Sequence, residues 1–441
     1  MNQPSLELWG GIECTVNRVG RRYHDQLRFS GHQRRADDLQ AIASLGFQAL
    51  RYPVLWEHAA PRRADDIDLC WADVRLQLLR EHGITPIVGL LHHGSGPRYT
   101  SLLDPRFPVK LASYAGAVAR RYPWLKCFTP VNEPLTTARF SGLYGHWYPH
   151  ERSDRAFARA LVNQARGTAL AMAEIRRVIP DAELVHTEDL GFVRSTPDLS
   201  YQAEFENERR FLGLDLLYGR VDRHHPLHPF LRSAGIREAE LERFHTNPCV
   251  PNLLGFNYYV TGERFLDSRV SLYPPHVIGG NSHQRYADVE AVRICRDGLL
   301  GPTALLTEAY QRYRTEVAIT EAHLGGPAEE RARWFSYVWQ SAEAARRGGV
   351  PVRAVTAWAL LGSYGWDKLV TRGPCSYEAG AFTIEGDALV ETPYASFLRA
   401  VAQGAPCVSD GGWWRHSERL LYAEADADQM ETIESASRSA T

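Results

Sequence analysis

Residues 126–134 read KCFTPVNEP, an apolar stretch of strand-like composition that ends in an Asn-Glu pair and is stopped by a proline. Proline has no backbone N–H to give to a sheet, so we expect a short strand here with Glu133 at its carboxyl end. Seven further runs of similar composition occur along the chain, at residues 6–13, 47–53, 84–93, 182–189, 252–259, 316–323 and 352–360.

Helical patterns lie between several of these runs. Apolar residues recur at spacings of three and four in residues 34–45, 68–82, 109–121, 156–178 and 328–347. Strands that alternate with helices indicate a parallel sheet. Eight such units in one chain predict an α/β fold, a single (β/α)8 TIM barrel with enlarged loops after its strands.

The composition is that of a globular protein and excludes several function classes. Of the 441 residues, 44% are hydrophobic and 23% are charged, and the formal net charge is −2. The near balance of positive and negative charge gives no indication of a nucleic-acid-binding surface, and no apolar run reaches the roughly 18 residues of a membrane span.

The N-terminus has no signal-like segment, so we expect a cytoplasmic protein. The seven scattered cysteines predict reduced, mostly buried thiols.

The predicted barrel occupies residues 1–416. Residues 417–441 are rich in Glu, Asp, Ala and Ser, so we expect them to form a flexible tail. The long segments 191–249 and 261–315 are expected to enlarge the loops around the barrel mouth without forming a separate domain. The sequence gives no indication of an oligomeric state.

Polar or aromatic residues follow each of the eight predicted strands. In a (β/α)8 barrel these strand ends share one face and point into a common bowl, which predicts an active site there. The residues, in strand order, are Glu13; Arg51; His92 and His93; Asn132 and Glu133; Glu188 and Asp189; Asn257 and Tyr259; Glu321; and Trp358.

Glu133 and Glu321 are the candidate catalytic residues. Both end apolar runs, and three β/α units separate them, so their strands lie across the barrel from each other. Cleavage of a glycosidic bond needs one carboxylic acid to protonate the leaving oxygen and one carboxylate on the far side of the sugar. We expect the two carboxyl groups to converge at about 5 Å, the spacing at which a covalent sugar–enzyme ester forms.

Five motifs in the right order resemble those of family 1 glycoside hydrolases, which are retaining β-glycosidases with catalytic glutamates on strands four and seven. The resemblance runs from Trp9 to about Trp366. The motifs are Asn132-Glu133-Pro134, Ile319-Thr320-Glu321, Gly255-Phe256-Asn257-Tyr258-Tyr259, the Arg51-x-x-x-x-Trp56 pattern and Trp358-Ala359-Leu360-Leu361.

The resemblance implies a role for each matching residue. Glu133 becomes the general acid/base, Asn132 binds the 2-hydroxyl group of the sugar, and Glu321 becomes the nucleophile. Arg51 and Tyr259 are expected to bind Glu321 and to keep its pKa low. Glu133, without such partners and facing a carboxylate, is expected to have a raised pKa and to stay protonated.

The pair His92-His93 falls where the family has a histidine that binds the 3-hydroxyl group, and either residue fits the count. A metal site is disfavoured because neighbouring strand residues point to opposite faces and no other ligand cluster joins them. We therefore expect no metal and no cofactor.

The chain departs from the family at two sugar-binding positions. Asn17 stands where the family has a glutamine after strand one, and Gly365 where it has a glutamate after strand eight. We therefore expect an unusual sugar specificity. Candidates to bind the sugar, in addition to Asn257 and Trp358, are Asn17, Glu13, Trp366, Glu188, Asp189, Asp367 and Lys368.

The function predicted first is a retaining β-glycosidase that hydrolyses or transglycosylates a small glycoside without a cofactor. A catalytically inactive sugar-binding or regulatory barrel is the alternative, favoured by the two departures and disfavoured by the intact Asn132, Glu133 and Glu321. A metal- or phosphate-dependent barrel enzyme is a third reading, for which Gly325-Gly326 is the one hint of a phosphate loop.

Overall fold

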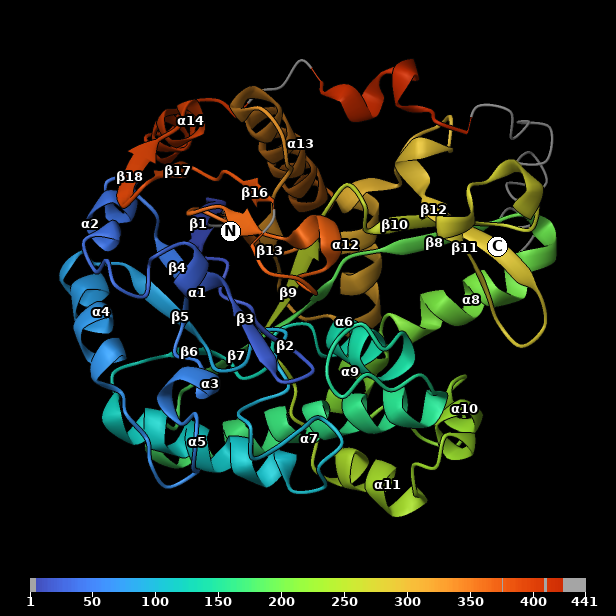
Figure 1. The fold of residues 1–441 in the computed structure, drawn as a ribbon, viewed down its shortest axis with the longest axis horizontal. Coiled ribbons are helices and arrows are strands. Elements are labelled where there is room, and N and C mark those ends of the chain that lie inside the picture. Colours follow the sequence, from blue (N-terminus) through green and yellow to red (C-terminus); the bar gives the residue numbers. More distant parts are fainter. Residues whose placement is uncertain (1–4, 375, 408–410, 423–441) are drawn as a thin grey trace.

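The computed structural model describes residues 5–374, 376–407 and 411–422. Eight parallel strands close into a barrel, in the order β1-β14-β13-β9-β7-β6-β5-β4 (Figure 1). Each of the eight predicted runs supplies one strand, so the predicted (β/α)8 barrel is confirmed. The strands are β1 (Glu7–Gly11), β4 (Ala49–Pro53), β5 (Thr85–Gly89), β6 (Cys127–Thr129), β7 (Glu183–Asp189), β9 (Leu253–Tyr258), β13 (Val317–Ala322) and β14 (Val352–Ala357).

The floor of the barrel is a layer to which every strand contributes one inward-facing side chain. Small residues pack there beside large ones, as the narrow interior of an eight-stranded barrel requires. This layer closes the barrel, so the polar residues at the strand ends sit in a bowl above an apolar floor. The layer consists of Trp9, Ala49, Ile87, Cys127, Val185, Leu253, Ala318 and Ala354.

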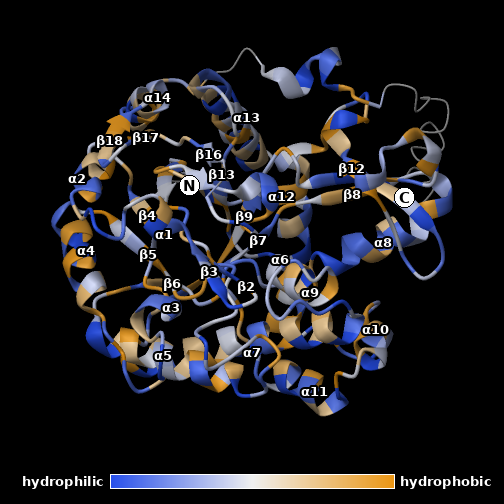
Figure 2. Cartoon of the chain, viewed as in Figure 1, coloured by the Kyte–Doolittle hydropathy of each residue, from blue (hydrophilic) through white to orange (hydrophobic). Residues whose placement is uncertain are grey.

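Helices surround the barrel, and the longer ones present both apolar and polar residues along their length (Figure 2). The five predicted helical patterns correspond to α2, α4, α5, α7 and α13. The helices are α1 (Gln26–Phe29), α2 (Asp38–Ala43), α3 (Trp56–Ala59), α4 (Cys70–Glu81), α5 (Phe107–Arg121), α6 (Pro134–Ala138), α7 (Asp154–Val178), α8 (Ser200–Arg209), α9 (Leu212–Leu217), α10 (His228–Ser233), α11 (Glu238–Thr246), α12 (Gly301–Tyr313), α13 (Ala328–Arg347) and α14 (Pro393–Ala402).

The two long insertions meet in one additional sheet beside the barrel. Strand β8 (Phe192–Ser195) of the first insertion pairs in parallel with β10 (Glu263–Asp267) of the second. Strands β12 (Arg285–Glu290) and β11 (Ile278–Gly280) complete this sheet. The two insertions thus contribute strands to one shared sheet.

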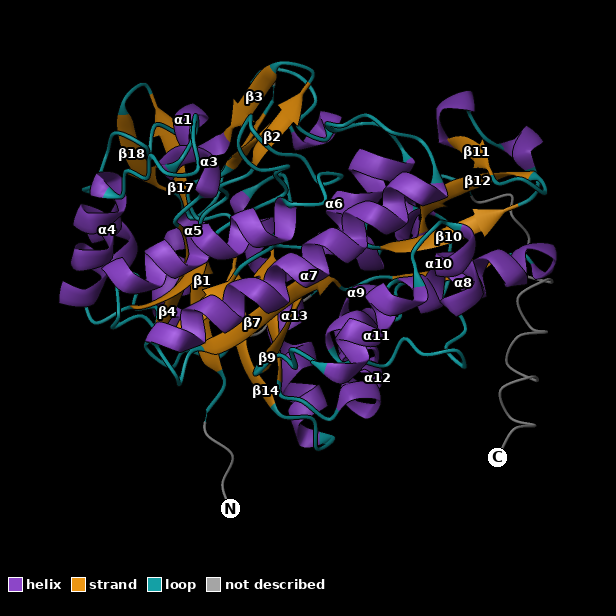
Figure 3. Ribbon diagram, turned by 90° about the horizontal axis from the view of Figure 1, so that it is seen from below, coloured by secondary structure: helices purple, strands orange, loops and turns teal. Residues whose placement is uncertain are grey.

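Three small two-stranded sheets lie in loops of the described residues. The first of them stands beyond one end of the barrel strands in Figure 3. Because it follows β1 directly, that end is the carboxyl end of the strands. The sheets are β2 (Val16–Val19) with β3 (Arg22–Asp25), β15 (Ser363–Tyr364) with β16 (Tyr377–Glu378), and β17 (Phe382–Glu385) with β18 (Ala388–Glu391).

The barrel strands are shorter than the predicted runs, and β5 and β6 differ most from them. Strand β5 ends at Gly89 rather than at His93, and β6 ends at Thr129 rather than near Glu133. Asn132 then rejoins the ladder through isolated bridges to His92 and Thr187. The polar residues after these strands therefore lie on irregular backbone, which changes how their side chains point.

The predicted tail is described as far as residue 422. Within it, Arg419 is buried and its Nη2 donates to the carbonyl oxygens of Cys295 and Arg296, each at 2.8 Å. These contacts attach residues 417–422 to the segment after β12, whereas residues 423–441 lie outside the described residues. No helix in the described ranges is both long and apolar enough to cross a membrane.

Candidate active site

Glu133 stands on a strained turn between β6 and α6. Its backbone has φ 42° and ψ 64°, in the left-handed region that is costly for a residue with a side chain. Its N–H donates to the carbonyl oxygen of Thr187 at 3.1 Å, and Pro134 starts α6 immediately afterwards. The turn lifts the buried Glu133 carboxyl group out of the sheet and into the bowl.

Glu321, on β13, is held at both carboxylate oxygens. Arg51 Nη1 donates to Oε1 at 2.6 Å and also to the carbonyl oxygen of Thr320 at 2.8 Å. The Tyr259 hydroxyl group donates to Oε2. Glu321 is 2% exposed, so the contacts that the sequence predicts for Arg51 and Tyr259 are present in a buried setting.

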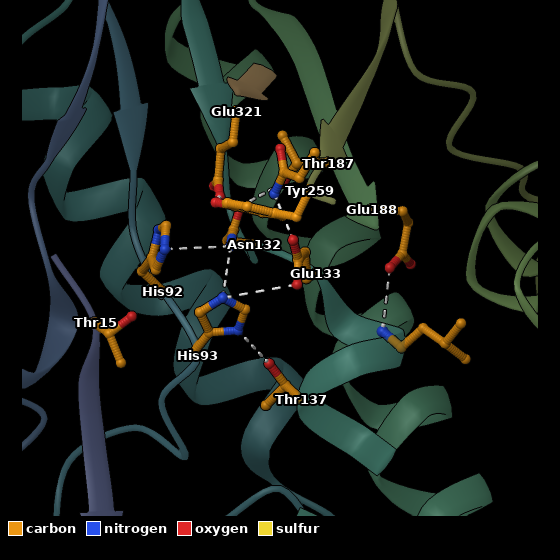
Figure 4. A network of polar contacts seen from close by, with 12 residues as sticks. Thr15, His92, His93, Asn132, Glu133, Thr137, Thr187, Glu188, Tyr259 and Glu321 are labelled. Atoms are coloured by element: carbon orange, nitrogen blue, oxygen red, sulfur yellow. Dashed lines mark hydrogen bonds and ion pairs between the residues drawn. The ribbon is translucent and has the colours of Figure 1, made fainter. Parts of the chain in front are cut away.

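The Asn132 amide contacts neighbours of both carboxyl groups, and its contacts with His92 and His93 are drawn in Figure 4. Its Oδ1 accepts from Arg51 Nη2 at 2.6 Å and from the Thr187 hydroxyl group at 2.8 Å. Its Nδ2 lies 3.3 Å from Nε2 of both His92 and His93. Each polar atom of this amide is therefore fixed in orientation.

Both histidines face the same network, which corrects the expectation that they point to opposite faces. Their ring centroids are 4.8 Å apart. The alternation of a strand does not apply, because β5 has already ended and His93 has a left-handed φ of 54°. Burial lowers the pKa of His93 to about 4 and that of His92 well below its ordinary value, so both rings are neutral at pH 7.

Glu133 has a closer partner than the sequence analysis expected. Asn257 Nδ2 donates to Glu133 Oε1 at 2.6 Å, and His93 Nε2 lies 3.7 Å from Oε2. Burial nevertheless raises the pKa of Glu133 to about 7, and the neighbouring Glu188 acts in the same direction. The direction agrees with the expectation of a raised value.

The pKa of Glu321 differs from the expectation of a low value. Burial raises it to about 8, although Arg51 and Tyr259 both act to lower it. Glu133 and Glu13 add to the rise, because further negative charge nearby disfavours ionisation. The sequence shows the favourable partners of Glu321 but does not show how completely water is excluded from it.

Trp358 follows β14 and packs between the other parts of the site. Its ring stacks on His92 at a centroid distance of 5.5 Å, and the Arg51 guanidinium carbon lies 4.7 Å from its centre. Gly11 on β1 leaves room for this ring, since a Cβ atom there would lie 2.3 Å from it. A glycine at this position is therefore a packing requirement of the site.

Glu13 and Trp366 form a hydrogen-bonded pair within the bowl. Trp366 Nε1 donates to Glu13 Oε2 at 3.2 Å, and the Trp366 ring lies 5.6 Å from that of His93. Asn17 is buried, and its Nδ2 donates to the carbonyl oxygen of Val370 at 2.9 Å. This side chain therefore anchors the loop after β14.

The other charged candidates lie in different surroundings. Glu188 is buried below α6, where its Oε2 accepts from Leu135 N at 3.3 Å, and burial raises its pKa well above the ordinary value. Asp189 is half-buried, and burial together with Glu133 raises its pKa to about 7. Asp367 and Lys368 are exposed, and Lys368 Nζ lies 3.6 Å from Asp367 Oδ2.

Sequence reasoning missed four residues that orient the site. Thr187 binds Asn132, Thr320 Oγ1 donates to Asn257 Oδ1 at 2.7 Å, and Thr137 Oγ1 lies 3.2 Å from His93 Nδ1. Trp147 packs against His93 at 5.4 Å. Thr187 and Thr320 directly precede the predicted site residues Glu188 and Glu321, and this position in the sequence could have identified them.

The described residues offer little to a metal or a phosphate. They contain no group of three or more His, Cys, Asp or Glu side chains placed to hold a metal ion. At the predicted phosphate hint, a Cβ atom on Gly325 would lie 3.0 Å from the Glu378 carboxylate. A carboxylate so close to this backbone repels a phosphate group.

A comparison with known proteins finds a partial sequence match to a β-glucosidase. No family model matches the chain. A thermostable β-glucosidase B from Thermobispora bispora is 28% identical over 145 residues, which are 30% of this chain and 29% of that protein. The matched region thus spans less than a third of this curated relative.

Solved structures match over most of the chain. A β-glucosidase from Thermotoga maritima in complex with noeuromycin has a TM-score of 0.72 at 18% identity, covering 91% of this chain and 99% of the other. A family 1 β-glucosidase from the same organism, in complex with isofagomine lactam, has a TM-score of 0.71 at 18% identity, covering 85% and 87%. The chain is thus similar in fold to family 1 β-glucosidases, as its motifs predict.

Proposed function

We propose that this protein is a retaining β-glycosidase with Glu133 as general acid/base and Glu321 as nucleophile. The observation that carries the proposal is the network around two buried carboxyl groups. Arg51 and Tyr259 bind Glu321, whereas Glu133 receives the neutral amide of Asn257. Burial raises the pKa of both groups, and the reaction uses the form of the pair in which the one proton lies on Glu133 and the charge lies on Glu321 beside the Arg51 cation.

The reaction has two displacement steps. In the first, Glu133 gives its proton to the leaving oxygen while a carboxylate oxygen of Glu321 attacks the anomeric carbon, forming a glycosyl ester and releasing the aglycone. In the second, Glu133 takes a proton from a water molecule or an acceptor alcohol that attacks the same carbon. The ester bond then breaks and Glu321 regains its charge.

The residues around the two carboxyl groups can hold the sugar in a fixed orientation. Asn132, held by Arg51 and Thr187, places its Nδ2 between two histidine rings, where a ring hydroxyl group can bind. Orientation of the sugar before reaction is a large part of what such a site supplies. The similarity to β-glucosidases supports a β-linked sugar as the substrate.

The proposal is tested with a panel of nitrophenyl glycosides of both anomers, with NMR detection of the first anomer released. We expect hydrolysis of at least one β-glycoside with initial release of the β-sugar. Initial release of the α-sugar would exclude a retaining mechanism. Absence of turnover across the panel would favour the alternative of an inactive sugar-binding barrel.

A further inference from the structure

Glu13 has no part in the two displacement steps, yet it is a buried carboxylate within the bowl. We propose that Glu13 is a specificity-determining residue that accepts a hydrogen bond from a hydroxyl group of the cleaved sugar and excludes sugars carrying a negative charge. Uronides and sugar phosphates belong to the excluded class. This inference rests on the proposed β-glycosidase function and specifies its substrates.

The position of Glu13 fits a contact with the sugar away from the leaving group. Glu13 follows β1, which lies three strands around the barrel from β6, the strand before Glu133. Glu13 is 4% exposed, and its charge acts on the pKa of Glu321, of Tyr259 and of His93. The Trp366 indole that binds Glu13 Oε2 lies 5.6 Å from the ring of His93, and His93 Nε2 lies 3.7 Å from Glu133 Oε2, so the Glu13 carboxylate is close to the reacting centre.

Charge in the bowl explains why an anionic sugar is excluded. Three carboxyl groups, those of Glu13, Glu133 and Glu321, share the bowl with the cation of Arg51. That guanidinium is already bound to Glu321 and Asn132. The neighbouring histidines are neutral at pH 7 because burial lowers their pKa. A phosphate or carboxylate on the sugar would thus meet these carboxyl groups in a buried site, beside a cation that is already bound to two partners.

Hydroxyl groups, in contrast, find free acceptor capacity at Glu13. Its Oε1 accepts from Thr15 N at 2.8 Å and its Oε2 from Trp366 Nε1 at 3.2 Å. A carboxylate has about four lone-pair sites, so two donors leave room for further ones. The buried hydroxyl oxygen of Thr15, drawn with the site in Figure 4, also has no hydrogen-bond partner among the described residues.

The loop after β14 holds Glu13 in place. Trp147 Nε1 donates to the carbonyl oxygen of Leu369 at 2.7 Å, and Asn17 holds that of Val370. Leu369 and Val370 both have φ 51°, which is costly for residues with side chains and for a β-branched valine above all. Contacts that enforce such a backbone fix Trp366, and hence the orientation of the Glu13 carboxylate, before any sugar binds.

Strand β1 supplies a matched control for this pair. At its opposite end, Glu7 Oε2 accepts from Trp9 Nε1 at 2.7 Å, in the same carboxylate–indole arrangement but on the other side of the barrel floor. Glu13→Gln and Glu7→Gln therefore remove the same charge from the same kind of partner. Only the first change lies in the bowl.

The experiment compares nitrophenyl β-glucoside, β-glucuronide and 6-phospho-β-glucoside with the wild type and both variants. We expect the wild type to prefer the neutral glucoside. Glu13→Gln should lower kcat/KM for the glucoside roughly 10- to 100-fold, the effect of losing a hydrogen bond to a charged group, and should lower the glucoside-to-glucuronide ratio by at least tenfold. Glu7→Gln should leave the ratio unchanged.

Two results would overturn the inference while leaving the glycosidase proposal intact. One is a wild type that prefers the glucuronide or the 6-phosphate, and the other is a Glu13→Gln ratio equal to that of wild type. If none of the three compounds is hydrolysed, their binding is measured instead by tryptophan fluorescence. Equal weakening of the binding of neutral and anionic ligands by Glu13→Gln would count against the inference, whereas selective weakening of the binding of the neutral ligand would support it.

Discussion

Arg51 and Asn132 are joined by a 2.6 Å hydrogen bond from Nη2 to Oδ1, although they leave the barrel on different strands. The same guanidinium binds Glu321, and Asn132 precedes Glu133 in the chain. One cation thus links the position of both carboxyl groups. The buried Arg51–Glu321 pair can offset the cost of removing both charges from water only if the other donors of the guanidinium are also bound. Here the Thr320 carbonyl oxygen and Asn132 Oδ1 accept from them.

Arg51→Lys tests this link. Lysine keeps the charge but cannot reproduce the planar fork that reaches Glu321, Asn132 and the Thr320 carbonyl together. We expect kcat/KM on an aryl β-glycoside to fall about 100-fold, because both carboxyl groups lose their fixed geometry. Arg353→Lys is the control: Arg353 on β14 also binds two carboxylates, Glu316 and Glu183, but near the amino ends of the strands. Similar losses in both variants would show that Arg51 matters for folding rather than for catalysis.

The pH profile of kcat/KM should be bell-shaped with its optimum near pH 7–8. Burial raises the pKa of Glu133 to about 7 and that of Glu321 to about 8. The two carboxyl groups influence each other, so the two limbs of the pH profile belong to the pair rather than to one residue each. Between pH 7 and pH 8 the pair carries one proton, which is the reactive form. Initial rates between pH 5 and pH 10 check this. An optimum near pH 5, with activity lost by pH 7, would mean that the carboxyl groups are better solvated than the structure has them.

Gly11→Ala should damage the site without touching a catalytic group. A Cβ atom at this position would lie 2.3 Å from the Trp358 ring, and moving that ring disturbs His92 and Arg51. We expect a loss of about 1–3 kcal/mol in the free energy of unfolding, as for other overpacked cores, and at least a tenfold loss of activity. The control is Gly89→Ala on β5, where a Cβ atom would meet nothing within 4 Å. Equal effects of the two substitutions would refute the packing argument.

Glu57→Gln tests burial of a carboxyl group outside the bowl. Burial raises the pKa of Glu57 from its ordinary value of 4.5 to about 8, and its Oε1 accepts from Gly96 N at 3.2 Å. An acid with a raised pKa in the folded state releases its proton on unfolding between these values, so its contribution to stability is lost as pH rises from 4.5 to 8. Glutamine keeps the acceptor and cannot ionise. We expect the Tm of the variant to exceed that of wild type by several degrees at pH 8, with a smaller difference at pH 5. An equal difference at both pH values would contradict this.

The barrel could be predicted because strands covered on both faces leave continuous apolar runs in the sequence. The additional sheet could not, since β8 and β10 are short strands from two different insertions, with the barrel strand β9 between them in the chain. The contact of Asn17 with Val370, between residues 353 positions apart, is likewise invisible to local patterns.

Within the site, the motifs predicted the contacts of Glu321 but not its electrostatics. Its bonds to Arg51 and Tyr259 follow from the order of the strand ends, whereas its raised pKa depends on how tightly Trp358 and its neighbours exclude water. The shared orientation of His92 and His93 depends on the end of β5 and a left-handed backbone, which sequence periodicity does not indicate.

The roles of Glu133 and Glu321 are tested most directly by azide rescue of Glu133→Ala and Glu321→Ala, with an aryl β-glycoside that has a good leaving group. Without Glu133 the glycosyl ester still forms, and azide opens it to give a β-glycosyl azide with net retention. Without Glu321, azide attacks the sugar directly and gives an α-glycosyl azide. The account predicts these opposite anomers from the two variants; full activity in either variant, or the same anomer from both, would contradict it.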